Sequence, residues 1–167
     1  MDAEALAQRW DCDLIAKIVT ALNAGESITG LAAEAGLPRG EEPARGSIDL
    51  RGIDFSYQNL RGPWHVEKSK RYRFGVMLQG ADLSWADLSW ALLPRAVLTD
   101  AVLADARLNN TELIYADLSG ADLTGADMGG VWLLDTKLAG ARVEPEQLKT
   151  RRKLGQLDFD YNAYILK

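Results

Sequence analysis

The sequence predicts a mainly β fold in which the chain winds as a solenoid with one side for every five residues. Leucine or methionine recurs at every fifth position from Leu78 to Leu138. A small or β-branched residue, most often alanine, stands two positions before each of them. This period matches neither the roughly 2-residue repeat of a strand nor the roughly 3.6-residue repeat of a helix. These side chains can therefore share one interior only if every fifth residue begins a new side of a coil.

Residues 1–46 are expected to form a helical cap and a linker. A helix over residues 1–24 is predicted by apolar residues at four-residue steps, with Asp2 able to cap its start and Gly25 able to end it. The apolar positions are Leu6, Trp10, Leu14, Ile18 and Leu22. A second short helix is expected within residues 28–36, with Ser27 as its N-cap. Residues 37–46 hold two prolines and two glycines and indicate a linker.

Residues 47–145 carry the repeat. Three five-residue units fill 48–62 and fourteen more fill 76–145, in a frame shifted by three residues. Residues 63–75 fit no unit and are expected to form a loop that interrupts the coil. Residues 146–167 are expected to hold a C-terminal helix that begins near Pro145 and stops at Gly155, followed by a tail. In the tail, alternating large residues at 157, 159 and 161 favour an extended strand or packing against a partner.

Composition limits the class of protein. The 167 residues suit one domain, and the formal charge of −5 argues against general affinity for nucleic acid. Cys12 is the only cysteine, which excludes an internal disulfide and favours a reducing compartment. The N-terminus lacks the apolar core of a signal peptide, and no apolar run is long enough to cross a membrane. We expect a cytoplasmic, bacterial-type protein.

Several units carry a recognisable motif. The units ADLSW, ADLSG, ADLTG and ADMGG, together with IDLRG and IDFSY, resemble the A(D/N)LXX signature of the pentapeptide-repeat family over residues 48–145. The resemblance implies a right-handed quadrilateral parallel β-helix with four units per coil and about four coils, roughly 20 Å long at the spacing of paired strands. The open ends of such a solenoid need covers, and the helices at the two ends of the chain are the expected caps.

Four units per coil would place residues twenty apart on the same outer face. The first face then holds residues 76–80, 96–100, 116–120 and 136–140, and the second holds 81–85, 101–105, 121–125 and 141–145. The third face holds residues 86–90, 106–110 and 126–130, and the fourth holds 91–95, 111–115 and 131–135.

The fourth face is the first candidate site, because six of its nine outward positions are apolar or aromatic. These are Leu92, Pro94, Ile114, Tyr115, Trp132 and Leu134. A contiguous apolar patch seldom faces water on a monomer. Either the N-terminal helix, the insertion or the tail covers it, or it is an interface for a partner or a second copy.

The insertion is the second candidate, because it gathers basic and aromatic residues on an acidic protein. They are Trp64, His65, Lys68, Lys70, Arg71, Tyr72 and Arg73. Such residues can bind phosphates and stack on bases, or the segment is only a solvated loop that re-enters the coil. His65 has no second histidine or nearby cysteine to complete a metal site, and no metal or cofactor is expected.

Outward aspartates form a third candidate, an acidic surface. They are Asp82, Asp87, Asp105, Asp117, Asp122 and Asp127. Aspartate before the central leucine suits a tight corner because its carboxylate can accept hydrogen bonds from nearby amides. We therefore expect no catalytic carboxylate pair or calcium site.

No nucleophile and base form a catalytic set, so the sequence favours a non-enzymatic scaffold for protein–protein interaction. The alternative is a DNA-mimic modulator of DNA gyrase, similar to the quinolone-resistance branch of the family. A β-helix of this length would span only about six base pairs of DNA. The insertion is also basic. In both respects the sequence departs from that branch of the family. A homodimer through the C-terminal helix and tail, or through the apolar fourth face, would be a further arrangement.

Overall fold

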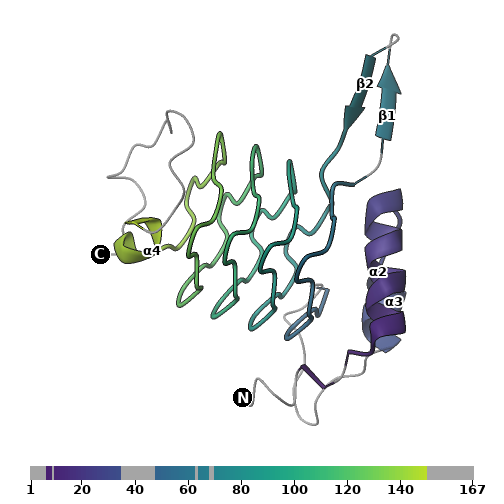
Figure 1. Ribbon diagram of the computed structural model, residues 1–167, viewed down its shortest axis with the longest axis horizontal. Coiled ribbons are helices and arrows are strands. Elements are labelled where there is room, and N and C mark those ends of the chain that lie inside the picture. Colours follow the sequence, from purple (N-terminus) through teal and green to yellow (C-terminus); the bar gives the residue numbers. More distant parts are fainter. Residues whose placement is uncertain (1–6, 9, 35–47, 63, 68–69, 150–167) are drawn as a thin grey trace.

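The computed structural model describes residues 7–8, 10–34, 48–62, 64–67 and 70–149. Its helices are α2 (Cys12–Ala24), α3 (Thr29–Glu34) and α4 (Pro145–Lys149), and its two regular strands are β1 (Trp64–Glu67) and β2 (Lys70–Arg73). Residues 48–62 and 76–145 wind as a stack of coils. Helix α2 lies at one end of this stack, α4 lies at the other, and the β1–β2 hairpin leads away from the coils (Figure 1).

Parallel β-bridges hold the coils together and fix four units per coil. Asp82 pairs with Val102, and Val102 pairs with Asp122, so each step along the stack takes twenty residues. The same step recurs on all four faces between residues 77 and 142, as the resemblance to pentapeptide repeats implied. In the first coil the step is 33 residues, from Asp49 to Asp82, because residues 63–75 lie between the paired units.

The interior of the coil is built from the first and third residues of each unit. The central leucines and the alanines before them are almost completely buried, and Phe55 takes the leucine position in the first coil. Where Thr111 replaces alanine, its hydroxyl donates a hydrogen bond to the carbonyl oxygen of Leu88 at 2.7 Å. The repeat therefore fills a narrow core with one large and one small side chain per side.

Each corner is a tight turn closed by a backbone hydrogen bond, as from the Ala86 amide to the Leu83 carbonyl at 3.0 Å. The last residue of the unit has a positive φ, the backbone conformation that glycine adopts most easily. Bulky residues such as Trp90 (φ 62°) adopt it too. Their backbone is held there by the coils on either side, since the Trp90 amide also donates to the Asn109 carbonyl.

Helix α2 starts later than the sequence predicted. Its N-cap is Asp11, whose side chain accepts a hydrogen bond from the Leu14 amide at 2.7 Å, so the expected start near Asp2 is wrong for this helix. The predicted stop at Gly25 is confirmed by a left-handed backbone (φ 76°). Helix α3 begins at Thr29, and Ser27 bonds to the Thr29 hydroxyl instead of acting as the predicted N-cap. The predicted linker at residues 37–46 lies outside the described residues.

Helix α2 packs across the first coil. Its buried face includes Leu14, Ile18 and Leu22, which belong to the same apolar cluster as the leucines of the coil. The side chain of Asn23 accepts from the Gly62 amide at 3.0 Å and donates to the Asn59 carbonyl at 2.6 Å. These bonds satisfy backbone groups of the first coil that have no earlier coil to pair with.

The interrupting segment is more regular than the predicted loop. Strands β1 and β2 pair antiparallel, with Trp64 opposite Arg73 and Glu67 opposite Lys70. Aromatic and β-branched residues favour strands, and this segment contains Trp64, Val66 and Tyr72. Each strand has only four residues and pairs with no other sheet, so the pattern is too short to be recognised by its period.

Helix α4 starts at Pro145, as predicted. Its Leu148 is buried, and the Gln147 amide group donates to the carbonyls of Leu123 (2.8 Å) and Ala126 (2.7 Å) at the last coil. The predicted stop at Gly155 and the tail lie outside the described residues. None of the helices in the described part of the chain is long and apolar enough to span a membrane.

Candidate functional site

The structure brings the six predicted residues of the fourth face together. Bridges join Leu92 to Glu112 and Glu112 to Trp132, so these three side chains form a column along the stack. Pro94, Ile114 and Leu134 occupy the fourth position of the same units and form a second column. They face outward because the neighbouring central leucines point into the core.

The fourth face ends at a corner that combines aromatic and charged side chains. The guanidinium of Arg95 lies 4.9 Å from the ring centroid of Tyr115, one coil away. This is a cation–π contact. Asp135 follows at the next corner of the same column and is exposed. The patch therefore has an apolar middle and charged groups of both signs along one margin.

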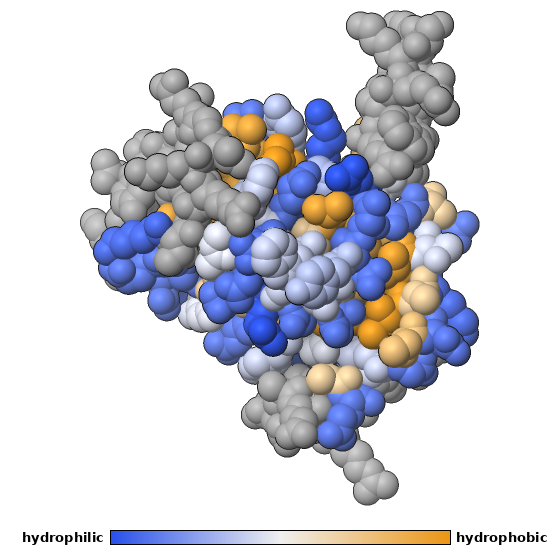
Figure 2. Space-filling model, in the orientation of Figure 1, coloured by the Kyte–Doolittle hydropathy of each residue, from blue (hydrophilic) through white to orange (hydrophobic). Residues whose placement is uncertain are grey.

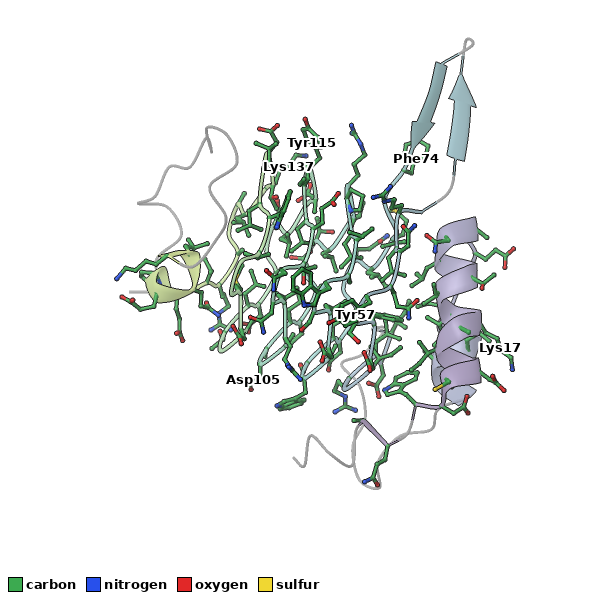
Figure 3. All side chains as sticks on the ribbon, in the orientation of Figure 1. Lys17, Tyr57, Phe74, Asp105, Tyr115 and Lys137 are labelled. Carbon is green, nitrogen blue, oxygen red and sulfur yellow. The ribbon has the colours of Figure 1, made fainter. Side chains whose placement is uncertain are left out.

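The exposure of its side chains shows whether another segment of the chain covers the fourth face. Tyr115 is 49% exposed, and Ile114 and Leu134 are partly exposed. Figure 3 places Tyr115 on an edge of the coil away from α2, and α2 instead crosses the end of the stack. Of the three covers considered, α2 is therefore excluded, the hairpin leads away from the coil, and the tail lies outside the described residues.

The first face extends the apolar surface in a way that sequence analysis missed. Met77 is 52% exposed and pairs with Val97, which is partly exposed. Both occupy the second position of a unit, where aspartate is common, and this substitution was the signal available in the sequence. Apolar residues also gather where α2 meets the first coil (Figure 2).

A cavity of about 260 Å³ lies at this junction. Its lining combines the C-terminal end of α2 with the segment that returns from the hairpin, and it includes Leu22, Phe74 and Met77. Phe74 lies at the base of the hairpin (Figure 3) and is 50% exposed. The lining of this cavity is mainly apolar. The cavity can therefore accept an apolar group, but it contains no pair of nucleophile and base.

Sequence analysis also missed an aromatic pair on the surface. The rings of Tyr57 and Trp90 are 6.2 Å apart and nearly parallel, with an angle of 3° between their planes. Both are exposed, Tyr57 by 74%. The two residues are 33 positions apart instead of twenty, because the insertion separates their units, so the twenty-residue map does not pair them.

Most aspartates of the predicted acidic surface accept hydrogen bonds from a residue of their own unit. Asp82 accepts from the Ser84 amide and hydroxyl, and Asp122 accepts in the same way from Thr124. The prediction that these aspartates bond to nearby amides is thus confirmed. Asp105 differs, because it lies at a corner with a positive φ of 57°.

Cations one coil away reduce the negative charge of these columns. The pairs are Arg107–Asp87, Lys137–Asp117 and Arg142–Asp122, each at 3.2 Å. Burial opposes ionisation of Asp117, but hydrogen bonds from Ser119 and Lys137 outweigh it and lower the pKa of the carboxyl below its ordinary value of 3.8. The pKa of Asp122 is lowered in the same way, against burial, by Thr124 and Arg142. Each of the first three faces therefore carries charges of both signs.

The hairpin gathers the basic candidates on one projecting element. Its register places His65 opposite Tyr72 and Val66 opposite Arg71. Lys68 lies outside the described residues.

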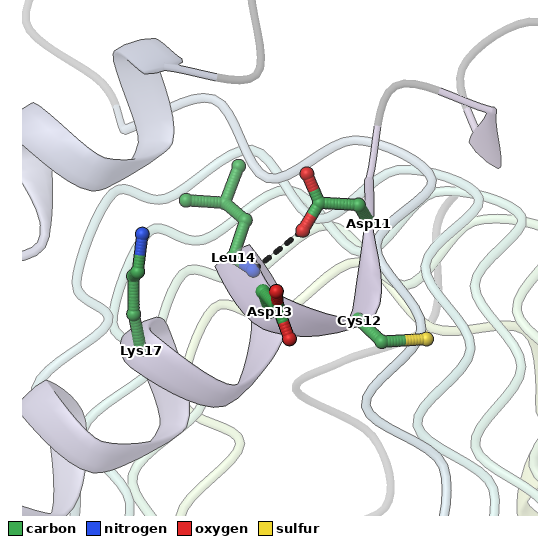
Figure 4. A pocket seen from close by; sticks show the side chains of 5 residues that line it. All are labelled: Asp11, Cys12, Asp13, Leu14 and Lys17. Atoms are coloured by element: carbon green, nitrogen blue, oxygen red, sulfur yellow. Dashed lines mark hydrogen bonds between the residues drawn. The ribbon is translucent and has the colours of Figure 1, made fainter.

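The first turn of α2 borders an open hollow of about 480 Å³ (Figure 4). Its lining is Asp11, Cys12, Asp13, Leu14 and Lys17. Asp11 already serves as the helix cap, and the described residues hold no group of three side chains that could bind a metal ion. We assign no chemistry to this hollow.

Comparison with known proteins agrees with this architecture. Residues 81–114 and 93–130 match the family model described as "Pentapeptide repeats", in eight copies. These residues are therefore similar to pentapeptide repeats. Pentapeptide repeat proteins fold as right-handed β-helices.

Solved structures of the same kind resemble parts of the chain. Rfr23, a pentapeptide repeat protein from the cyanobacterium Cyanothece 51142, is 29% identical, and the match covers 65% of this chain and 68% of Rfr23 with a TM-score of 0.47. HetL, from Nostoc sp. strain PCC 7120 and involved in heterocyst differentiation regulation, is 30% identical over 56% of this chain and 46% of HetL, with a TM-score of 0.36. QnrB1, a plasmid-mediated fluoroquinolone resistance protein, is 16% identical over 60% of this chain and 62% of QnrB1, with a TM-score of 0.39. No curated protein matches the sequence significantly.

Proposed function

We propose that this protein is a non-enzymatic scaffold for protein–protein interaction and that its fourth face is the docking surface. The observation that supports this most is the apolar column of Pro94, Ile114 and Leu134, carried through three successive coils. Beside it runs a second column in which Leu92 and Trp132 flank Glu112. Every coil is bonded to the next along its backbone. A surface held in this way loses little conformational freedom when a partner binds, and this favours affinity.

The composition of the face suits a partner with an apolar ridge flanked by charged groups. Ile114 and Leu134 supply the apolar middle, and Arg95, Glu112 and Asp135 supply charges of both signs around it. Exposed aromatic and arginine side chains are the residue types that contribute most to protein interfaces. Tyr115 and Arg95 already contact one another, so they present a preformed margin.

The absence of an enzymatic function is also part of this proposal. The outward aspartates are used for turn bonds and for ion pairs with cations one coil away. Of the two cavities described, one is mainly apolar. The other contains the Cys12 thiol, but none of the hydrogen bonds of the described residues joins this thiol to a base, and Asp11 is used as the helix cap.

The DNA-mimic alternative has less support from the charge distribution. A mimic of a phosphate backbone needs an unbroken row of negative charge, whereas Arg107 follows Asp87 and Lys137 follows Asp117 along their faces. The assay that decides it is DNA supercoiling by gyrase. A lack of any effect at micromolar protein would remove this alternative.

The docking proposal can be tested with one charge placed at one of two equivalent positions. Ile114→Glu introduces a carboxylate in the middle of the fourth face. Ala104→Glu introduces the same group at the same position of a unit, in the same coil but on the second face. Both side chains are partly exposed, so neither variant buries the new charge in the core.

We expect the same partner to co-purify with the wild type and with Ala104→Glu, and not with Ile114→Glu. Affinity purification with mass spectrometry identifies the partner, and binding of the purified pair is then measured by titration calorimetry. Light scattering of each variant reports whether the partner is a second copy. Equal binding by all three proteins would contradict the assignment of the fourth face.

A further inference from the structure

We propose that the first coil is open on one side and that this opening binds an extended peptide in which lysine or arginine neighbours an apolar residue. The described first coil has three units, at residues 48–62, whereas the next coil, residues 76–95, has four. The three units pair with the second, third and fourth faces of that coil, at Asp82, Asp87 and Leu92. Among the described residues, no unit stacks on residues 76–80 of the first face, and the two strands of the hairpin pair only with one another.

The open side is marked by backbone groups that are paired on the other faces. On the second face, the Asp82 amide donates to the first coil at 2.9 Å, and the carbonyls of Asp82 and Ser84 accept from it at 2.8 and 2.9 Å. The corresponding groups of the first face are the amide and carbonyl of Met77 and the carbonyl of Gln79. None of these three groups has a backbone partner in the part of the chain that the structure describes. Such a set of unpaired groups is a template for an added strand.

The cavity of about 260 Å³ borders this strand edge. Gly75 and Met77 line it from the coil, Phe74 lines it from the returning segment, and Leu22 lines it from α2. The side chains of Met77 and Phe74 are 52% and 50% exposed. Methionine adapts its shape to an apolar neighbour, and methionine and aromatic residues are enriched in protein interfaces. The edge and the cavity together suit a strand that places one apolar side chain between Leu22 and Phe74.

A negative charge at the same cavity favours a basic neighbour for that apolar residue. Glu26 lines the cavity directly after Gly25, which ends α2, and its side chain is exposed. The Glu26 amide donates to the Ala21 carbonyl at 2.9 Å, which fixes this residue on the helix end. The C-terminal end of a helix adds partial negative charge. A lysine or arginine of the peptide therefore finds a complementary charge beside the cavity.

The bound strand supplies the bonds that the first coil supplies on its other sides. One peptide carbonyl accepts from the Met77 amide, and two peptide amides donate to the carbonyls of Met77 and Gln79. The backbone bonds provide affinity, while the cavity and Glu26 provide the preference for sequence. None of these residues belongs to the fourth face, so this site is separate from the docking surface proposed above.

Two fluorescent peptides of equal length test the charge preference. The basic one is acetyl-Lys-Ala-Lys-Leu-Ser-Gly-Lys-amide, and glutamate replaces every lysine in the acidic one. Fluorescence anisotropy with the full-length protein measures both dissociation constants. We expect the basic peptide to bind at least about tenfold more tightly, because only its charge complements Glu26. Glu26→Lys should reverse this preference.

A matched pair of lysine substitutions tests the position of the peptide. Met77→Lys replaces the exposed apolar side chain of the edge with a charge that repels the basic peptide, and it should weaken binding at least about tenfold. The coil accepts lysine here, since Lys137 occupies the same position of the same face. Val102→Lys makes the same change of charge at the same position of a unit on the second face. It should leave the affinity unchanged.

Amide hydrogen exchange tests the added strand itself. In the protein without peptide, we expect fast exchange at Met77 and slow exchange at Val97, whose amide donates to the Val76 carbonyl at 2.9 Å. Saturation with the basic peptide should slow exchange at Met77 at least about tenfold. The same peptide with an N-methyl group on its leucine lacks one of the two donating amides and should bind more weakly.

Three results would overturn the proposal. The first is binding of neither peptide, or equal binding of both, by the wild-type protein. The second is an amide of Met77 that already exchanges slowly without peptide at every protein concentration, because another part of the chain then covers the edge. The third is slow exchange that is lost on dilution while light scattering shows a dimer becoming a monomer, because a second copy then occupies the site.

Discussion

The backbone of Gly75 packs directly against the carbonyl group of Arg95. A Cβ atom at residue 75 would overlap the carbonyl oxygen and carbon of Arg95 and the amide nitrogen of Ala96. All three are backbone atoms of the second coil, which cannot rotate away as a side chain can. This close approach occurs where the chain returns from the hairpin, and it allows an insertion to leave the coil without disturbing its bridges.

Gly75→Ala is therefore expected to destabilise the protein by about 1–3 kcal/mol, the usual cost of overpacking. Urea unfolding followed by circular dichroism measures the change. Gly30→Ala is the control, because Gly30 lies in α3 and has open space around it. Alanine is preferred to glycine in helices, so the control should be neutral or slightly stabilising. Equal losses in both variants would show that the contact with Arg95 is unimportant.

The coil was predictable because a five-residue period fits neither a helix nor a flat strand. The four units per coil, and with them the step of twenty residues, came from the resemblance to pentapeptide repeats. The fourth face was found by the same arithmetic. The Tyr57–Trp90 pair was not, because thirteen inserted residues change its spacing to 33. The start of α2 was misplaced because Asp2 and Asp11 are both good N-caps, and only the structure shows Asp11 bonded to the Leu14 amide.

Thr111→Val tests a completely buried polar side chain at a position where most units have alanine. The substitution keeps the shape of the side chain but removes the hydroxyl that donates to the Leu88 carbonyl at 2.7 Å. That carbonyl also accepts from the Ala91 amide, so it keeps one partner. We expect a loss of about 1 kcal/mol, the net value of an ordinary hydrogen bond. An unchanged urea midpoint would mean that the apolar gain of valine offsets the lost bond.

The lowered pKa values of Asp117 and Asp122 predict that stability depends on pH in the acidic range. The folded state favours the ionised carboxylates, so their contribution is complete above the ordinary value of 3.8 and is lost as the pH falls through the lower folded-state pKa. Melting temperatures measured from pH 6 to pH 3 should therefore fall most at the acidic end. The double variant Asp117→Asn with Asp122→Asn should fall less steeply. Parallel curves would contradict the assignment to these two residues.

Helix α2 is predicted to contribute to the stability of the first coil through its buried side chains. Ile18 is completely buried between the helix and the coil, and truncating a buried isoleucine to alanine costs about 2–5 kcal/mol. Lys17→Ala is the matched control, because Lys17 is the preceding residue and points away from the coil (Figure 3). In Ile18→Ala, the Leu50 and Phe55 amides should exchange faster, by at least the factor that corresponds to the global loss of stability. If those amides stay protected while only α2 opens, the helix is an independent unit and the first coil does not need it.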